Sequence, residues 1–403
     1  MIYMIQGVFL HDTRGNMKDY YRNTYITIDN RILENNASIL TAAYPHKYCI
    51  AVVKGNAYGH GYGIIPALKR GGINAFAVSN LNEALKVREY DREYPVIMLE
   101  PVHKEYYSIC AANDISVCVN DLDTFNEIVE SGLKLKLQIK VDCGMNRLGF
   151  KDKKELEGVV NEAFERENLT VEGIFSHFHT TGLADREYER DLERFVYLTK
   201  DLPLGRIPMV HVDKSQTIMA HEKPDFTTAV RFGVVLYGFN LMNKYTDDLK
   251  GRLRKFKHDF NNKRNGVAPS KEYPELDLKT ALTLYTEVLQ TKKVAPGEYV
   301  GYGLSHKAEK EETVATIDTG YADGINRKRV GSMVSINGKK YPIIGEVGMG
   351  MCEVLVDDTV KRYDKVTVFG GEIPIRSITR HVMTTMYELM TNLDSSIPRI
   401  YED

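Results

Sequence analysis

The stretch YCIAVVKGNAYGHG, residues 48–61, joins an apolar segment to a glycine-rich turn through a lysine. Residues 48–53 are apolar and partly β-branched, which indicates a strand. Lys54 follows without a break, although the charge of a lysine is costly to desolvate. A single lysine at a strand end is usually a surface residue, so its meaning depends on whether the rest of the chain repeats this arrangement.

Short apolar runs recur through the first part of the chain and alternate with stretches of helical pattern. The runs are YCIAVV (48–53), AFAVSN (75–80), PVIMLE (95–100), ISVCVN (115–120), LQIKVD (137–142), VEGIFSHF (171–178), PMVHVD (208–213) and VVLYG (234–238). Near-continuous apolar strands separated by helices are typical of parallel strands covered on both faces. Eight of them favour an α/β fold of the closed (β/α)₈ kind, a TIM barrel, with an open doubly wound sheet as the alternative.

The texture of the sequence changes after residue 238. Residues 243–277 are polar and charged, which predicts a linker or surface insertion. From residue 278 short strand-like runs alternate with turn signals, among them Asn337-Gly338, so the second domain is expected to be mostly β. The predicted segments are an N-terminal extension (1–21), a barrel (22–242), the insertion (243–277) and a C-terminal β domain (278–403).

The composition of the 403-residue chain is that of a globular protein, with 43% hydrophobic and 27% charged residues. A net charge of −2 gives no reason to expect a nucleic acid or a membrane surface as a partner. The five cysteines contain no C-x-x-C pair, which indicates reduced thiols and neither disulfides nor a metal site. The apolar start lacks a basic n-region, and no run is long enough to span a bilayer. We therefore expect a cytoplasmic protein with a small-molecule substrate.

Polar residues gather where the predicted strands begin or end, and barrel enzymes build their active sites at the carboxyl ends of strands. The candidates are Lys54 after the first run, Lys140 and Arg147 around the fifth, His177 in the sixth, Ser215 after the seventh and Arg231 before the eighth. A lysine with a desolvated amine suits Schiff-base chemistry with a carbonyl cofactor such as pyridoxal phosphate. The glycine in RFGVV (231–235) would let backbone N–H groups approach a phosphate, with Ser215 as a second contact.

Six motifs resemble the alanine racemase family. They are VVKGNAYGHG, KVDCGMNRLGF, SHFH, VRFGVVLYG, VGYG and TGYADGINR, in this order. The resemblance covers roughly residues 22–242 and 280–401. It implies a pyridoxal 5'-phosphate-dependent isomerase with an N-terminal (β/α)₈ barrel and a C-terminal β domain. It also implies a homodimer with shared active sites that interconverts L- and D-alanine and supplies D-alanine for peptidoglycan.

The same resemblance assigns roles to individual residues. Lys54 matches the lysine that holds the cofactor and doubles as one catalytic base. Tyr302 matches the second base, which reaches the site from the partner subunit. The binding matches are Tyr58, Ser215, Gly233 and Val234 for the cofactor phosphate, Arg231 for the pyridine nitrogen, His177 beside the ring, and Arg147 and Met349 for the substrate. Lys140 matches a lysine that is carbamylated in some members, with a salt bridge to Asp142 as the alternative.

The chemistry of racemisation agrees with these roles. A proton must leave one face of a planar intermediate and return on the other, so one base on each face is the simplest arrangement. Lys54 and Tyr302 would each work far from their free pKa near ~10, which requires burial and cationic neighbours. Arg231 beside the pyridine nitrogen would disfavour its protonation and so limit transamination. We therefore expect Lys54 to be buried.

Departures from the family pattern lie around the expected substrate entrance. Glu346, Gly348, Gly350 and Met351 stand where members usually carry Arg, Ser, Asp and Gln; Ser395 and Ser396 replace a tyrosine and an arginine; Gly182 replaces an acid. These changes leave open a serine racemase or a broad-specificity racemase that also accepts basic amino acids. A decarboxylase and a non-catalytic pyridoxal phosphate-binding protein are weaker alternatives. Glu346 would favour a cationic substrate, unless it forms a surface salt bridge.

Overall fold

The computed structural model describes residues 22–180, 187–239 and 276–403, with a few single residues between 253 and 264. The predicted N-terminal extension, most of the predicted insertion and Gly182 lie outside these residues. The chain divides into two compact units. Among the described residues, the barrel unit contains those of 33–57 and 65–279, and the β unit contains those of 22–32, 58–64 and 280–403.

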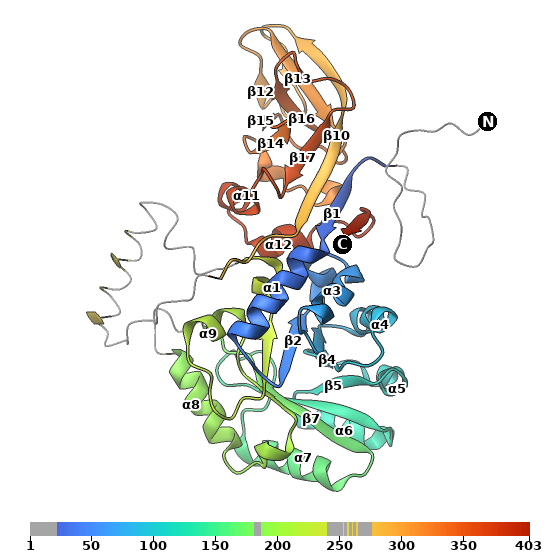
Figure 1. The fold of residues 1–403 in the computed structure, drawn as a ribbon, viewed down its shortest axis with the longest axis vertical. Helices are drawn as coiled ribbons and strands as arrows, with labels where there is room; N and C mark the ends of the chain where they lie inside the picture. Colours follow the sequence, from blue (N-terminus) through green and yellow to red (C-terminus); the bar gives the residue numbers. More distant parts are fainter. Residues whose placement is uncertain are drawn as a thin grey trace, which may run out of the picture. The chain divides into compact units, whose positions relative to one another are not determined.

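Eight parallel strands form the barrel unit (Figure 1). They are β2 (Tyr48–Val52), β3 (Ala75–Val78), β4 (Val96–Met98), β5 (Ile115–Val119), β6 (Leu135–Val141), β7 (Leu169–Ser176), β8 (Met209–His211) and β9 (Ala229–Phe232). From β2 to β8 each strand pairs with the next, and β2 also pairs with β9. The N–H of Thr228 donates to Val210 O at 3.0 Å, which closes the ring between β8 and β9. The predicted closed barrel is confirmed, and the open sheet is not formed.

Helices connect the successive strands of the barrel, and α1 (Asn30–Ala43) precedes the first of these strands. The connecting helices are α3 (Ile65–Arg70), α4 (Leu81–Tyr90), α5 (Tyr107–Ala112), α6 (Leu122–Ser131), α7 (Lys153–Glu165), α8 (Glu187–Thr199) and α9 (Ser215–Ala220). Asn80, Asp121 and Asp152 cap three of them, because each side chain accepts the backbone N–H three residues further on. The strands they flank are almost wholly buried, as expected where both faces of a sheet are covered.

The eighth barrel strand lies earlier in the chain than predicted. The apolar run at 234–238 is not a strand: Val234–Tyr237 forms the 3₁₀-helix η4, and β9 precedes it. Gly233 lies between β9 and η4, and its backbone angles, φ −100° and ψ −115°, are not those of a strand. Val234 and the residues up to Tyr237 are buried. The run is apolar because it is buried, and periodicity alone cannot tell a short buried helix from a buried strand. That prediction was wrong.

The β unit is built on a second, mostly antiparallel sheet (Figure 1). Its order is β13 (Glu312–Ile317), β16 (Cys352–Val356), β15 (Lys339–Ile344), β14 (Met333–Ile336), β17 (Lys365–Phe369), β10 (Leu282–Val294), β1 (Tyr25–Asp29) and β18 (Arg399–Glu402). Because β10 also pairs with β13, six of these strands close on themselves. The hairpin predicted at Asn337-Gly338 joins β14 to β15. The unit also holds β11 (Tyr299–Val300), β12 (His306–Lys307), α11 (Ile375–Val382) and α12 (Met386–Thr391). The predicted mostly β domain is confirmed.

The division of the chain differs from the predicted boundary at residue 22. Strand β1 pairs antiparallel with β10 and parallel with β18, so it belongs to the β unit. Its residues alternate between partly and fully buried, as in a sheet with one covered face. Tyr58–Ile64 also belongs to this unit. Within it, position 59 requires a glycine. Its φ is +81°, and a Cβ there would lie 2.2 Å from Met390 O.

Two further expectations can be compared with the described residues. All five cysteines are free and buried, as expected of reduced thiols. Within the described ranges, no helix has the length and apolar character needed to cross a membrane.

Candidate active site

Lys54 follows β2 directly and opens the turn α2 (Lys54–Tyr58). The next four residues have positive φ: Gly55 62°, Asn56 53°, Ala57 50° and Tyr58 51°. The left-handed region costs an L-residue about 1–2 kcal/mol, and only glycine adopts it freely. Strain of this kind persists only where the surroundings hold it, and it clusters at functional sites.

The Lys54 side chain is 40% exposed, and its Nζ lies 3.8 Å from Oε1 of Glu100. The prediction that Lys54 is buried was therefore wrong for this chain. Lys54 lies beyond the last residue of β2, Val52, and so outside the buried part of the strand. Glu100 follows β4, so both residues lie at the C-terminal ends of strands in one barrel.

Arg231, on β9, is 3% exposed and carries the most completely enclosed charge among the predicted site residues. Its guanidinium donates to the carbonyl oxygens of Ser176 (2.7 Å), His211 (2.9 Å) and Val212 (3.0 Å), and to Nδ1 of His211. Burial lowers the pKa of Arg231 to about 10, which still leaves it cationic at neutral pH. The His211 ring is fully buried and stacks on Phe175, and burial followed by the charge of Arg231 lowers its pKa well below 6.5.

His177, directly after β7, lies within reach of several cations. Burial first, and then the charges of Arg231, Lys214, Arg147 and Lys140, lower its pKa from 6.5 to about 2. His177 is therefore a neutral imidazole at physiological pH. No hydrogen bond to its ring is found within the described ranges, so the ring is available for contact with a bound molecule.

Lys140 on β6 is 5% exposed, and its Nζ donates to Leu99 O at 3.0 Å. Burial is the main reason that its pKa is lowered. The alternative salt bridge with Asp142 is not formed. The Asp142 carboxylate instead accepts the N–H groups of Gly144 and Asn146, both at 3.0 Å.

Arg147 lies on the loop that follows β6, and its side chain is exposed. It makes no hydrogen bond or ion pair with the described part of the chain, yet its charge contributes to the lowered pKa values of His177 and Lys140. An unpaired guanidinium at the mouth of a cationic site can bind a carboxylate through two parallel hydrogen bonds.

Ser215, Gly233 and Val234 come together although they belong to different strand–helix connections. Ser215 begins α9, and its Oγ accepts the N–H of Gly233 at 2.8 Å. Val234 begins η4 and is 2% exposed. The first N–H groups of a helix have no partner inside it, so two such starts beside a serine hydroxyl provide donors for a phosphate.

Sequence reasoning missed Lys214, the residue just before Ser215. Its Nζ donates to Phe178 O at 2.7 Å, and burial, followed by the charge of Arg231, lowers its pKa to about 8. The signal was visible in HVDKSQ (211–216), where the lysine stands beside a predicted phosphate contact.

Three predicted site residues lie in the β unit. The ring centroid of Tyr58 is 6.1 Å from that of Tyr387. Tyr302 is 73% exposed and stands between Gly301 and Gly303, whose φ values are 69° and 70°. Met349 is 64% exposed.

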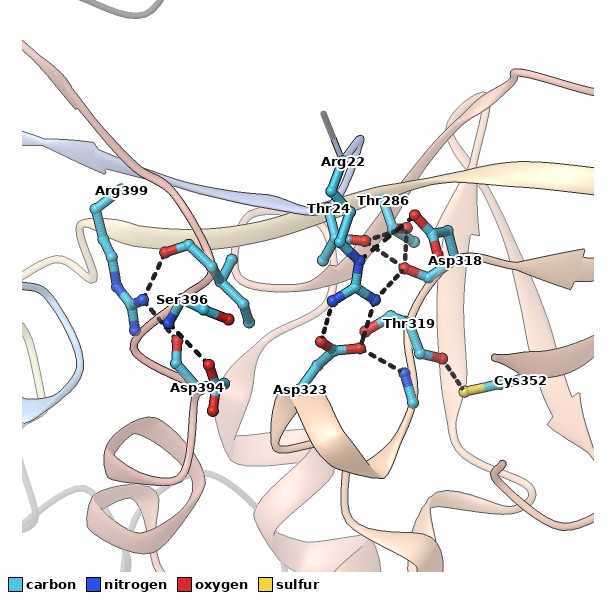
Figure 2. Close-up of polar contacts among 12 residues, drawn as sticks. Arg22, Thr24, Thr286, Asp318, Thr319, Asp323, Cys352, Asp394, Ser396 and Arg399 are labelled. Atoms are coloured by element: carbon cyan, nitrogen blue, oxygen red, sulfur yellow. Dashed lines mark hydrogen bonds and ion pairs between the residues drawn. The ribbon is translucent and has the colours of Figure 1, made fainter. Parts of the chain in front are cut away.

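A buried carboxylate, Asp323, organises the backbone turn that contacts Met349. Asp323 accepts the N–H of Gly320 at 2.8 Å and a hydrogen bond from Nη2 of Arg22, also at 2.8 Å (Figure 2). The turn that it forms donates two N–H groups, from Tyr321 and Ala322, to the carbonyl oxygens of residues 348 and 349, both at 2.9 Å. Asp323 therefore supports the Met349 loop through the backbone.

The structure shows the contacts and exposure of three residues that depart from the family pattern at the expected entrance. Glu346 forms an ion pair with Arg327, so the surface salt bridge is the alternative found. Gly350 has no atom near its Cβ position. Ser395 is exposed, on a turn whose carbonyl groups at Asp394 and Ile397 accept from Arg399, each at 2.6 Å (Figure 2).

The fold and the site define a class of protein. A closed α/β barrel that carries a lysine on a strained turn, a buried arginine and two short helix starts at its strand ends is typical of an α/β-barrel enzyme.

Comparison with known proteins identifies the family. Residues 28–241 match the alanine racemase N-terminal domain, and residues 281–401 match the alanine racemase C-terminal domain. The alanine racemase of Geobacillus stearothermophilus is 30% identical over 396 residues, 96% of this chain and 95% of that protein. The chain therefore belongs to the alanine racemase family, as the motifs predicted, and it is an amino-acid racemase.

The fold of the chain is similar to solved structures of the same family. The alanine racemase from E. faecalis is 30% identical, with a TM-score of 0.82 over 95% of this chain and 99% of that one. The alanine racemase from Bartonella henselae, solved with covalently bound pyridoxal phosphate, is 27% identical, with a TM-score of 0.75 over 94% and 99% of the two chains.

Proposed function

We propose that this racemase depends on pyridoxal 5'-phosphate and interconverts L- and D-alanine, supplying D-alanine for peptidoglycan. The observation that carries the proposal is the position of Lys54, on a strained turn at the carboxyl end of β2. The same barrel supplies phosphate-compatible donors at Ser215 and Val234 and a buried cation at Arg231. The covalently bound cofactor of the Bartonella henselae relative supports the same cofactor here.

The residues present fit this cofactor. Lys54 would hold it covalently, and Tyr58, Ser215, Gly233 and Val234 would bind its phosphate. When bound, the cofactor supplies an electron sink for the charge that develops at the substrate Cα. Arg231 stays cationic and is held by three carbonyl groups, so it would disfavour a second positive charge on the pyridine nitrogen beside it.

The remaining site residues bind the substrate and move its proton. Arg147 would bind the substrate carboxylate with its unpaired guanidinium, and the Met349 backbone would contact the same group. The neutral ring of His177 would lie against the cofactor without adding charge. Lys54 would serve one face of Cα, and the partner subunit's Tyr302 the other, each taking or returning the proton.

Carbamylation of Lys140 is part of the proposal. Only a free amine reacts with carbon dioxide, and the lowered pKa of Lys140 increases the fraction of free amine. The carbamate would then bring a negative charge toward the Arg147 guanidinium and hold it for the substrate.

A homodimer is part of the proposal. Five large apolar side chains in two segments of the β unit are exposed: Tyr299 (48%), Tyr302 (73%), Leu304 (68%), Met349 (64%) and Met351 (50%). The two segments approach each other where the Tyr302 ring lies near Gly348, and exposed apolar side chains of this size favour an interaction site. A second copy of the chain would cover them and would place Tyr302 in a shared active site.

Shared sites can be tested by mixing two inactive variants. Lys54→Ala and Tyr302→Phe chains should regain activity once chain exchange has been proved by mass spectrometry, since each heterodimer would contain one site with both bases. No recovery in exchanged dimers would overturn the shared site.

The whole proposal is tested by Lys54→Ala, with Lys86→Ala on the exposed face of α4 as the matched control. Racemisation of L-alanine, followed by chiral chromatography, should fall by about 10³-fold or more in Lys54→Ala. Borohydride reduction and intact mass should find a covalent cofactor adduct in the native protein and in Lys86→Ala only. Undiminished activity of Lys54→Ala would overturn the assignment.

A second substrate, L-serine, is favoured by Ser395. The resemblance places a tyrosine at this position in family members, and the exposed serine leaves space and a hydroxyl instead. The ion pair of Glu346 with Arg327 removes the reason to expect a basic substrate. We therefore expect kcat/KM to be highest for alanine, then serine, and lowest for lysine and arginine, and measurement of all four tests this order.

A further inference from the structure

Glu83, near the start of α4, joins the Lys54 turn to the end of the neighbouring strand. Its Oε1 accepts the N–H of Gly55 at 2.7 Å, and its Oε2 accepts the N–H of Ser79 at 2.9 Å. Its own N–H donates to Oδ1 of Asn80, the cap of α4, at 3.1 Å. One carboxylate therefore connects the segments that follow β2 and β3 through backbone groups on both sides.

The Lys54 turn needs such an anchor. Residues 55–58 all have positive φ, a conformation that a free chain containing Asn56, Ala57 and Tyr58 would leave readily. The N–H of Ala57 donates back to Val53 O at 2.9 Å, which closes the turn on the strand. Gly55 is the first left-handed residue of the turn, and its N–H bond to Glu83 ties the turn to a side chain outside it.

We propose that Glu83 is a positioning residue for Lys54. It acts through the Gly55 backbone and not on the amine, since the ion-pair partner of Lys54 within the described residues is Glu100. By holding the turn in its left-handed form, the carboxylate fixes the direction in which the Lys54 side chain leaves β2. This inference rests on the proposed role of Lys54 as the cofactor-binding base.

The acid is required because both of its partners are donors. A carboxylate offers an acceptor oxygen to each N–H, and charged acceptors form the stronger hydrogen bonds. Glutamine offers one oxygen and would turn its amide NH₂ toward the second N–H, so Glu83→Gln keeps one of the two bonds. Alanine keeps neither. The two variants should therefore form a graded series.

The first readout needs neither cofactor nor activity. Hydrogen exchange of a peptide covering residues 54–58, measured by mass spectrometry on cofactor-free protein, should be faster in Glu83→Gln and fastest in Glu83→Ala. The matched control is Glu89→Gln on the same helix, where Glu89 pairs with Lys86 and the exchange should be unchanged. Unchanged exchange in Glu83→Ala would overturn the proposal even if the protein were a racemase.

The second readout concerns the proposed chemistry. In folded, cofactor-saturated protein, kcat should fall by about tenfold in Glu83→Gln and about 10²-fold in Glu83→Ala, with a smaller change in KM, because a misplaced base affects the reacting step more than binding. The yield of borohydride-trapped adduct should fall in the same order. A loss of thermal stability with normal kcat and normal trapping would mean that Glu83 is merely structural. An active Lys54→Ala would instead disprove the proposed role of Lys54 and leave the exchange result standing.

Discussion

Two arginines, one in each unit, show opposite ways of holding a positive charge. Arg231 in the barrel unit is 3% exposed and is bound by carbonyl groups and a neutral histidine, and burial lowers its pKa to about 10. Arg22 in the β unit forms hydrogen bonds to Asp323, and these bonds, opposed by partial burial, raise its pKa (Figure 2). Against this effect of burial, the charge of Asp213 raises the pKa of Arg231, without a side-chain hydrogen bond between the two residues in the described part of the chain.

The difference separates a charge kept for use from a charge kept for structure. An ion pair such as Arg22–Asp323 neutralises itself and leaves little field for a ligand. A buried guanidinium without a bonded carboxylate costs folding free energy, and such costs concentrate at functional sites. The barrel unit accepts the same kind of cost in the left-handed turn after Lys54.

The largest effect is expected from Arg231→Ala. The substitution leaves the carbonyl groups of Ser176 and Val212 without their donor and the buried Asp213 without a compensating charge, so stability should fall by about 3–5 kcal/mol. Urea unfolding of the two proteins measures the change. Arg231→Lys keeps the charge but not the full set of donors, so its stability should lie between those of the native and Arg231→Ala proteins. An Arg231→Ala protein as stable as the native one would contradict the comparison.

Arg22→Ala should have a smaller effect, of about 1–3 kcal/mol, because the buried Asp323 loses a charged donor but keeps the Gly320 N–H. The loss should appear as a lower thermal unfolding temperature, and kcat should change less than in Arg231→Lys. Arg31→Ala, which breaks the exposed pair with Asp29, is the control and should leave the unfolding temperature unchanged. Equal effects of the Arg22 and Arg31 substitutions would mean that burial of Asp323 adds nothing to the strength of its pair with Arg22.

The sequence predicted those features that depend on local pattern. Seven of the barrel strands follow directly from apolar runs flanked by helical stretches, and Asn337-Gly338 predicted its hairpin. The run at 234–238 misled because a buried 3₁₀-helix and a buried strand share the same composition. The assignment of β1 to the β unit depends on its pairing with Leu282–Val294, which lies far along the chain.

The site was predicted less completely for the same physical reason. The positions of Lys54, Arg231 and Ser215 follow from strand ends, which a sequence pattern can locate. The hydrogen bond from Gly55 to Glu83 spans 28 residues and depends on how α4 packs, so no local pattern indicates it. The 40% exposure of the Lys54 side chain is likewise a property of the folded chain that no local pattern indicates.

A third, smaller effect sharpens the comparison through pH. His177 has its pKa lowered to about 2, whereas an unfolded chain would protonate it near 6.5. Below pH 6.5 the unfolded state therefore binds a proton that the folded state does not, and stability falls as the pH falls. Removal of this group in His177→Gln should reduce the slope of stability against pH by about 1 kcal/mol per unit between pH 6 and pH 5. Urea titrations at each pH measure it, and parallel curves would show that burial and the cations around His177 do not suppress its protonation.

The smallest effect on stability, but a clear one on selectivity, is expected from Ser395→Tyr. Ser395 is exposed, and Arg399 fixes the turn around it through the carbonyl groups of Asp394 and Ile397, so a larger side chain should be tolerated without unfolding. An aromatic wall rejects an added hydroxyl weakly, so kcat/KM for L-serine should fall by about tenfold relative to L-alanine. Ser377→Tyr, at an exposed position of α11, is the control for an added tyrosine and should leave the ratio unchanged. If the native enzyme already prefers alanine by several orders of magnitude and Ser395→Tyr changes nothing, the β unit does not set the substrate, and selectivity must come from the barrel residues that carry the chemistry.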